Sequence, residues 1–238
     1  MNKIIYYLTI CVLASCSNQI VLRENIIDMG KEGSPKIYHQ NKLFSGTVQE
    51  YYSNKSLKIE SSFKQGKLNG NTKFFSETGV LILNANFKSN YKNGIFKQYN
   101  DSGILLIDAF YKKDKKHLAF KQYNESGILL IDGFYKKDKK HLAYNQYNDV
   151  GILIIDEFYK KGKKHLANKH YNDSGILITE YFYKKGLKDG TIRLYNENSK
   201  LLSEEEYLKD VLHGKSTKWD EKGDVIEEKI YKKGVLNE

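Results

Sequence analysis

Residues 94–117 read GIFKQYNDSGILLIDAFYKKDKKH, and residues 118–141 repeat the pattern as LAFKQYNESGILLIDGFYKKDKKH. Units of this kind follow one another eight times, 24 residues apart and without insertion or deletion, starting at Gly46, Gly70, Gly94, Leu118, Leu142, Leu166, Gly190 and Gly214. A fixed short period is typical of arrays in which each unit contacts only its neighbours. The sequence therefore predicts a repeat protein whose binding surface is built by repetition and not by one pocket.

Each unit is predicted to hold two strands. In residues 94–117, Ile95, Lys97 and Tyr99 alternate with Phe96 and Gln98, which is the two-residue period of a strand. A turn at residues 100–103 follows, rich in residues that adopt the left-handed conformations of tight hairpins. The second strand, residues 104–112, ends at a second turn. One position of that turn holds only residues that tolerate positive φ, namely Gly66, Asn90, Asp114, Asp138, Gly162, Gly186, Asp210 and Gly234.

These hairpins predict the fold class. One proline and 19 tyrosines in 238 residues also favour strands over helices. We expect an all-β, elongated, single-layer antiparallel meander of 24-residue hairpin repeats over residues 35–238. Residues 35–43 are predicted to form half a unit in the same register.

The first residues are predicted to be an export signal. A short basic start and an apolar run to Leu13 are followed by Ala14, Ser15 and Cys16. This segment resembles the lipobox of bacterial lipoproteins, and the resemblance implies cleavage before Cys16 and diacylation of its thiol. The implied organisation is a signal peptide at 1–15, a lipidated tether at 16–34 and the repeat array at 35–238. Ser17 would direct such a lipoprotein to the outer membrane of a Gram-negative bacterium. The alternative is an ordinary secretory signal with a chance cysteine.

Charge and cysteine content restrict the partners. The net charge is +10, and removal of the signal takes away only Lys3. Cys11 and Cys16 are the only cysteines, so the mature array cannot rely on disulfides. A basic surface suits an anionic partner. Behind a lipoprotein signal we expect lipid head groups, envelope polyanions or an acidic protein, and not nucleic acid, although a solvated surface without a partner is the alternative.

The repeat spacing argues against an enzyme. Adjacent strands are about 4.8 Å apart, so one repeat position recurs about every 9.6 Å. The three histidines His117, His141 and His165 therefore cannot chelate one metal ion, whose ligands lie about 2 Å from it, and we interpret them as turn residues. The carboxylates at another position are expected to pair with lysines across the strands: Glu60, Asp108, Asp132, Asp156, Glu180, Glu204 and Glu228. We predict a non-enzymatic protein without a cofactor or metal site.

Two surface features are candidates for binding. The first is a basic edge at the second turns, formed by Lys115, Lys116, Lys139, Lys140, Lys163 and Lys164. The second is an apolar patch of the middle units, predicted to lie on one face because the side chains alternate along the strand. It consists of Ile104, Leu106, Phe110, Ile128, Leu130, Phe134, Ile152, Ile154, Phe158, Ile176, Ile178 and Phe182. Leu105, Ile107, Ala109 and Tyr111 are predicted to form the other face.

The patch becomes polar in the flanking units, which is typical of an interface. The alternative is that strong twist folds the patch partly onto itself.

The repeat resembles a known family. Residues 171–177, YNDSGIL, and 183–190, YKKGLKDG, are similar to the bacterial variant of the MORN repeat, found in proteins labelled YwqK-type antitoxins. Leu118, Leu142 and Leu166 depart from the glycine that the family has at the start of a unit, so the second turns of those units are expected to be the ones that could differ. The resemblance implies an elongated scaffold that binds a protein partner or another copy of itself. The alternative function is an antitoxin or immunity-like protein.

Overall fold

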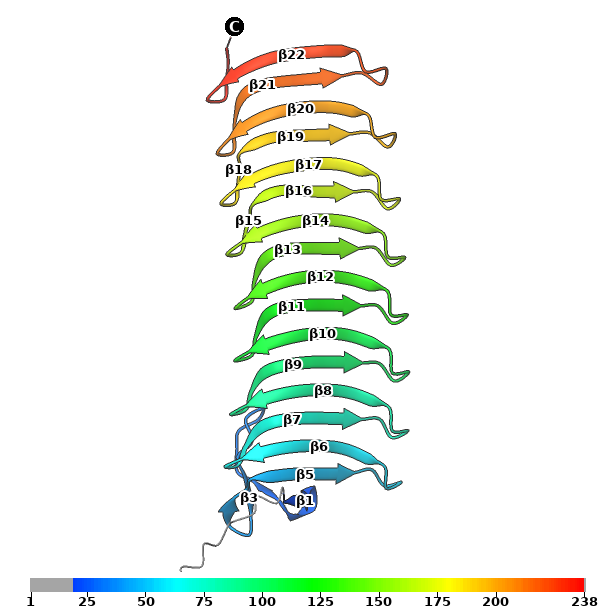
Figure 1. The fold of residues 1–238 in the computed structure, drawn as a ribbon, viewed down its shortest axis with the longest axis vertical. Coiled ribbons are helices and arrows are strands. Elements are labelled where there is room, and N and C mark those ends of the chain that lie inside the picture. The colour runs from blue at the N-terminus through cyan, green and yellow to red at the C-terminus, as the bar shows by residue number, and fades with distance from the viewer. Residues whose placement is uncertain (1–18, 238) are drawn as a thin grey trace, which may run out of the picture.

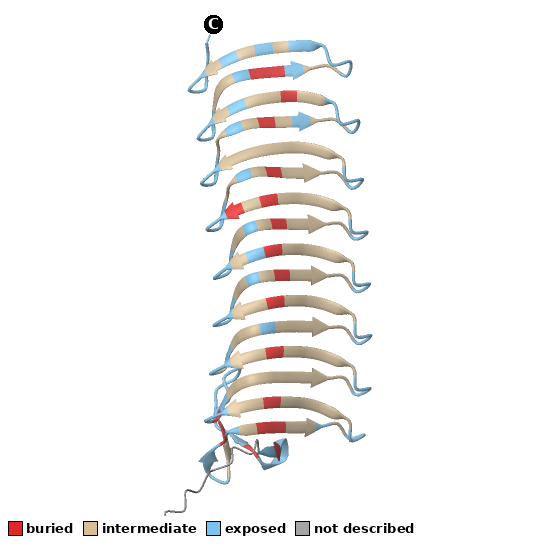
Figure 2. Ribbon diagram, in the orientation of Figure 1, coloured by how far each residue is buried: buried red, intermediate tan, exposed pale blue. Residues whose placement is uncertain are grey.

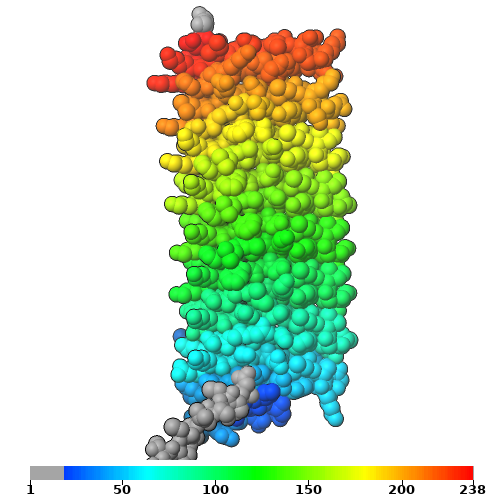
Figure 3. Space-filling view, viewed as in Figure 1, coloured from blue at the N-terminus to red at the C-terminus, as the bar shows by residue number. Residues whose placement is uncertain are grey.

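The computed structural model describes residues 19–237. Its main element is an open sheet of 20 strands, in which strands that follow one another in sequence pair antiparallel, so that the hairpins stack into a long column (Figures 1 and 3). This confirms the predicted all-β, single-layer meander. The strands of the repeats are β5 Gly46–Tyr51, β6 Leu57–Lys64, β7 Lys67–Phe75, β8 Leu81–Lys88, β9 Tyr91–Tyr99, β10 Leu105–Lys112, β11 Lys115–Tyr123, β12 Leu129–Lys136, β13 Lys139–Tyr147, β14 Leu153–Lys160, β15 Lys163–Lys164, β16 Leu166–Tyr171, β17 Leu177–Lys184, β18 Leu187–Lys188, β19 Gly190–Tyr195, β20 Leu201–Leu208, β21 Val211–Trp219, β22 Val225–Lys232 and β23 Val235–Leu236.

The second turns adopt the predicted conformation in every unit. Lys113 and Asp114, for example, have φ of 53° and 61°, so both central residues are left-handed, as a two-residue type I′ hairpin requires. Successive turns are also bonded to each other. The Asp114 N–H donates to the Lys92 carbonyl at 3.0 Å, and the Asp114 Oδ1 accepts from the Lys92 N–H at 2.6 Å. The turns thus extend the sheet ladder along its edge.

Histidines take part in the same edge where the turn holds glycine. His141 Nδ1 accepts from the Lys161 N–H at 3.3 Å, and His213 Nδ1 accepts from the Lys233 N–H at 3.2 Å. His141 and His165 thus bond to the following turns, as their interpretation as turn residues expects, whereas His117 Nδ1 has no hydrogen-bond partner within the described residues.

The three leucines at unit starts take an unusual backbone conformation. Leu118, Leu142 and Leu166 have φ of 63°, 64° and 60°, in the left-handed region that disfavours bulky side chains by about 1–2 kcal/mol per residue. The second turns that precede them are unchanged, so the departure from glycine is absorbed locally. Between β10 and β11, Ala109 pairs with Phe120 and Tyr111 pairs with Lys116. The stretch between these two pairs is two residues longer on β11 than on β10. Leu118 lies in this irregular segment.

A β-bulge near the first turn changes which side chains share a face. Leu105 pairs with Tyr99, but Ile107 pairs with the adjacent Gln98. Because directly opposed residues point to the same side, Leu105 and Ile107 lie on opposite faces. The prediction that Leu105 shares a face with Ile107, Ala109 and Tyr111 is therefore wrong. Simple alternation fails at this point because the bulge adds a residue to the second strand of each hairpin.

One face carries the core, and we call it the aromatic face. Its rings stack edge to face along the column, with centroids 5.7 Å apart for Phe120 and Tyr135, 6.3 Å for Tyr135 and Tyr144, and 6.2 Å for Tyr144 and Tyr159. Phe120 is 4% exposed and Tyr144 is 5% exposed. The buried residues form a band along the middle of the sheet (Figure 2). Each unit thus buries its rings against those of its neighbours.

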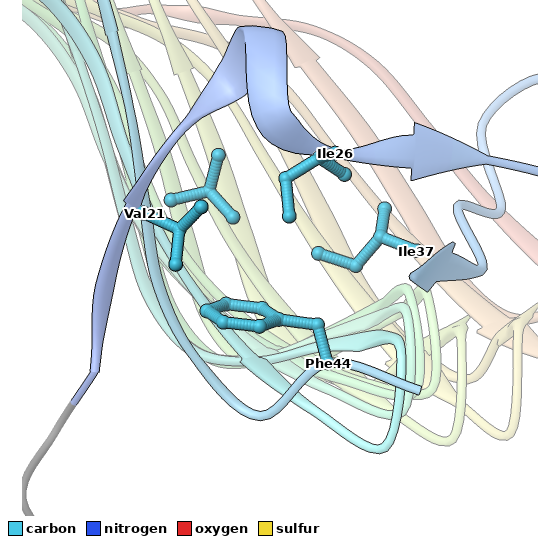
Figure 4. Packing of buried hydrophobic residues seen from close by; sticks show 5 residues of the cluster. Val21, Ile26, Ile37 and Phe44 are labelled. Carbon is cyan, nitrogen blue, oxygen red and sulfur yellow. The ribbon is translucent and has the colours of Figure 1, made fainter. Parts of the chain in front are cut away.

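An N-terminal cap covers the aromatic face of the first unit (Figure 4). It comprises β1 Ile20–Leu22, a 3-10 helix at Arg23–Asn25, β2 Ile27–Asp28, β3 Ile37–His39 and β4 Lys42–Leu43. β1 pairs parallel with β5, while β2, β3 and β4 form a separate small sheet. Val21, Ile26, Ile37 and Phe44 pack with Val48 of β5 in one buried cluster.

The cap differs from the predicted N-terminal organisation. Residues 20–34, predicted to belong to the lipidated tether, include folded elements because Val21 and Ile26 find an apolar surface to pack on. The half unit at 35–43 is a hairpin, but it is one residue out of register. Tyr38 pairs with Leu43, whereas the repeat pairs Phe63 with Leu68, 25 residues later. Residues 1–18, with the predicted signal peptide and Cys16, lie outside the described residues.

Candidate functional site

The face opposite the aromatic face carries a row of ion pairs, and we call it the ion-pair face. Lys97 Nζ lies 2.9 Å from Asp108 Oδ2, and Arg193 Nε lies 2.6 Å from Glu204 Oε2. Lys121 with Asp132, Lys169 with Glu180, and Lys215 with Glu228 continue the row. The expected pairing across the strands is confirmed for Asp108, Asp132, Glu180 and Glu228, while Glu204 pairs with Arg193. Glu60 instead accepts a hydrogen bond from the Gln49 side chain at 2.9 Å, and no ion pair within residues 19–237 involves Asp156.

Four predicted binding residues form a row on the ion-pair face. Phe110, Phe134, Phe158 and Phe182 occupy the same position in β10, β12, β14 and β17, two residues beyond the carboxylates. Each lies directly opposite a smaller or aliphatic residue, which is Ile95 for Phe110 and then Ala119, Ala143 and Ala167. Phe134 is 40% exposed. Large and small apolar side chains thus alternate from strand to strand.

The other predicted binding residues do not join this row. The Cγ2 atoms of Ile104, Ile128 and Ile152 lie at the first turns, each within 3.3 Å of the position that a Cβ would take at the turn glycine of the next unit. Ile176 occupies the equivalent place in the last middle unit. These isoleucines stack along the first-turn edge.

Leu106 and its equivalents Leu130, Ile154 and Ile178 occupy the repeat position of Lys58. Lys58 forms an ion pair with Glu50, so the two side chains lie on one face. Glu50 lies directly opposite Ile59, and Ile59 is the equivalent of Ile107, which lies on the aromatic face. The prediction of one shared face is therefore wrong for these residues, because the bulge turns them to the aromatic side.

Sequence reasoning missed three residues that belong beside the phenylalanines. A Cβ at Gly190 would lie 3.0 Å from the Cβ of Phe182, and Leu118 and Leu142 line one hollow together with Phe134. Leu118, Leu142 and Leu166 are 53%, 44% and 54% exposed. The signal that could have found them was their departure from glycine. A leucine in a left-handed, exposed position has no structural advantage over the glycine of the flanking units.

Together these residues form a continuous surface, which we call the apolar strip. It consists of Ile95, Phe110, Leu118, Ala119, Phe134, Leu142, Ala143, Phe158, Leu166, Ala167 and Phe182. A hollow of about 200 Å³ lies between successive units and is lined by His117, Leu118, Phe134, Lys136 and Leu142, among others. The strip therefore has both protruding side chains and recesses.

The predicted basic edge is divided between the two faces. One half of the edge borders the apolar strip. Lys112, Lys136 and Lys160 each follow a phenylalanine of the row by two residues, and they lie directly opposite Lys115, Lys139 and Lys163. Like charges directly opposite each other destabilise a sheet. None of the ion pairs within residues 19–237 involves these six lysines. We call them the lysine row.

The remaining lysines of the edge fold over the aromatic face. Lys116 Nζ lies 3.6 Å from the centroid of the Phe120 ring, and Lys140 Nζ lies 3.2 Å from that of Tyr144. Lys164 lies over Tyr183 at 5.4 Å. Burial lowers the pKa of Lys116 and of Lys140 below the ordinary value of 10.5. These lysines shield the rings and are part of the core.

A buried carboxylate interrupts the aromatic face. Glu157, 5% exposed, replaces the small residues Ala109 and Gly133 of the preceding units. It accepts a 2.6 Å hydrogen bond from the Tyr159 hydroxyl and pairs with Lys164 at 2.6 Å and with His170 at 3.4 Å. Burial by itself raises the pKa of Glu157, but the hydrogen bonds from Lys164 and Tyr159 outweigh it and lower the pKa below the ordinary value of 4.5. This cluster satisfies its own charge and leaves no group free for a substrate.

The period, the hairpin register and the turn chemistry can now be compared with known proteins. Residues 44–65, 92–113 and 188–209 match the MORN repeat variant. Three units of the column are thus MORN-like repeats. Each match spans one hairpin, β5–β6, β9–β10 or β18–β20, and their starts are separated by multiples of the 24-residue period. MORN repeats have protein-binding and scaffold roles, and their fold is typically non-catalytic.

Two further findings accompany this match. No curated protein matches the chain. Across residues 19–237 the chain contains no helix with the length and apolar character needed to span a membrane.

Proposed function

We propose that this protein is a non-enzymatic scaffold that binds a protein partner through the apolar strip. The exposed leucines carry the proposal. Three consecutive units place leucine in the left-handed region at the position where five other units have glycine, and each leucine adds exposed apolar surface beside the phenylalanine row, of which Phe134 is exposed. Strain of this kind persists where the surrounding structure holds it and is concentrated at functional sites. Exposed apolar surface of this extent is typical of an interaction site.

The proposal includes attachment of the scaffold to a membrane through Cys16. The support is the lipobox-like segment that ends at Cys16. We place the protein at the cell envelope, in the outer membrane of a Gram-negative bacterium, where the lipid holds the MORN-like column at the surface. An antitoxin or immunity-like protein would use the same strip and would differ only in the identity of its partner.

Detergent partition tests the anchor. We expect the full-length protein to enter the detergent phase and to incorporate labelled fatty acid, because acyl chains contribute about 0.8 kcal/mol per buried methylene. Cys16→Ala should abolish both, whereas Cys11→Ala is the matched control and should change neither. Labelling that survives Cys16→Ala would reject the anchor without affecting the strip.

Partner capture tests the strip. Protein solubilised from membranes should retain its partner when wild type and lose it in the triple variant Leu118→Gly, Leu142→Gly, Leu166→Gly, which restores the residue of the flanking units. Val150→Ser is the control, because Val150 is 72% exposed at the first turn, away from the strip, and serine is the residue of three other units at this position. Equal capture by wild type and the triple variant would contradict the proposal.

A further inference from the structure

We propose that the apolar strip binds an amphipathic helix of a partner protein, and that this helix carries acidic side chains along the flank that faces the lysine row. The inference rests on the proposed function and adds the chemistry of the partner. Three observations carry it: the repeat spacing of the strip, its width between two charged rows, and the unpaired charge on one side only.

The spacing of the strip matches that of a helix. Phenylalanines in successive units stand two strands apart, or about 9.6 Å. Residues seven apart on a helix lie on the same side and are separated by about 10.5 Å along its axis. The two repeats agree within about 1 Å, so a slightly inclined helix can place one apolar side chain against each unit. The strip crosses eight strand positions from β9 to β17, since β15 and β16 both pair with β14 and occupy one position. This is about 34 Å, and a helix of about 22 residues has this length.

The width also fits. On β10 the ion pair of Asp108, the ring of Phe110 and the ammonium of Lys112 are two residues apart from one another on the same face. The charged rows on either side of the strip are therefore about 13 Å apart, while a helix with its side chains is about 10–12 Å wide. The leucines and phenylalanines lie between these two rows, with a hollow of about 200 Å³ beside Leu118, Phe134 and Leu142. Amphipathic helices bind apolar surfaces of this width through side chains at intervals of three, four and seven residues.

The two flanks differ in charge, which sets the orientation and sign of the helix. On one side the carboxylates of the ion-pair row, except Asp156, already have lysine or arginine partners, such as Lys97 with Asp108 at 2.9 Å. On the other side Lys112 opposes Lys115, Lys136 opposes Lys139 and Lys160 opposes Lys163, and none of these pairs has a carboxylate partner within the described part of the chain. Carboxylates on the facing flank of the helix would relieve this repulsion.

A second copy of the chain fits this surface less well. Its net charge is also +10, and most of its carboxylates on this face are already paired, so it offers little to the lysine row. A bilayer fits less well because side chains that insert must stand above their surroundings. Here the flanking lysines and ion pairs rise from the same sheet as the rings and leucines.

A pair of designed peptides tests the inference. The probe is a helical peptide of about 22 residues with leucines on one face at intervals of three, four and seven and glutamates along one flank. The control peptide has lysine in place of each glutamate. We expect the acidic peptide to bind the full chain. It should bind the triple variant Leu118→Gly, Leu142→Gly, Leu166→Gly about tenfold or more weakly, down to the level at which the lysine control peptide binds wild type. It should bind Val150→Ser as it binds wild type.

The double variant Lys136→Gln, Lys160→Gln tests the charge separately. It should weaken binding of the acidic peptide at about 50 mM salt and reduce the difference between about 50 mM and 300 mM salt. The double variant leaves the strip and every ion pair of the face intact, so it also serves if the triple variant does not fold.

Several results would overturn the inference. Failure of the acidic peptide to bind wild type, or equal binding of the acidic and lysine peptides, would reject an acidic helix. Self-association of the chain by sedimentation, lost in the triple variant, would identify a second copy as the occupant and would leave the scaffold function standing. Binding to phosphatidylglycerol vesicles, lost in the same variant, would replace the protein partner with a membrane and reject both proposals.

Discussion

The two faces of the middle units are both rich in apolar side chains, yet they differ in exposure. On the aromatic face Phe120 and Tyr144 are 4% and 5% exposed, whereas on the ion-pair face Phe134 and Leu142 are 40% and 44% exposed. Lysines fold over the rings of the first face, and the N-terminal cap covers its first unit. Nothing within residues 19–237 performs this role for the apolar strip. In a single-layer sheet, apolar character alone does not identify the core.

A second difference separates the middle units from the flanking ones. The flanking units begin with glycine, and the middle three begin with leucine in the left-handed region. The hairpin geometry is the same in both, so the fold does not require the leucine. The difference indicates that stability and surface chemistry are specified at separate positions of the same repeat.

Truncation of one ring on each face tests whether the two faces differ in their contribution to stability, and it has the largest expected effect. Tyr144→Ala should destabilise the protein by about 3–5 kcal/mol, because it removes a buried ring between Tyr135 and Tyr159. Phe134→Ala should cost about 1.5 kcal/mol or less, because that ring is already partly exposed. The measurement is the midpoint of urea unfolding for each variant. Equal losses for the two variants would show that both faces are core.

Acidification tests the polar centre of the aromatic face. Since the pKa of Glu157 is lowered on folding, its contribution to stability is complete above about pH 4.5 and is lost as the pH falls through the lower folded value. Between the folded and the unfolded pKa of Glu157, the unfolded chain binds up to one more proton than the folded chain. The free energy of unfolding therefore falls by at most about 1.4 kcal/mol for each pH unit of acidification. Wild type should therefore lose more stability between about pH 5 and pH 3 than Glu157→Gln. Parallel profiles for the two proteins, measured by urea unfolding at each pH, would contradict the assignment.

The smallest effect is expected in the ion-pair row. Asp132→Asn breaks the 3.5 Å pair with Lys121, whose side chain is 40% exposed. Exposed pairs of this kind contribute about 0–1 kcal/mol, and we expect a change of about 0.5 kcal/mol or less that disappears at high salt. A loss as large as that of Tyr144→Ala would place this row in the core and would remove the distinction between the faces.

Much of the architecture could be predicted from residue types at fixed spacing. Positive φ at Asp114 and Gly162 and the hairpins between them follow from local rules that hold in every unit, and the pairing of Asp108 with a lysine follows from one that holds in several. The faces could not be predicted in full. The bulge that separates Leu105 from Ile107 depends on how β10 pairs with β9, and no residue type marks it. The sequence therefore placed the phenylalanines in one row, as the structure does, but assigned Leu106 and Ile104 to the wrong face.

The sequence by itself determined the period, the two turns of each unit and the open meander, because these depend on contacts within one hairpin and between adjacent hairpins. Only the tertiary structure decided which apolar residues are buried. Burial depends on what covers a face: rings of neighbouring units and the lysines folded over them cover Tyr144, while the N-terminal cap covers Val48. It also decided that Leu118, Leu142 and Leu166 stand beside the phenylalanine row, since their left-handed backbone places them there. Both outcomes arise from packing between strands, which alternation along a single strand does not encode.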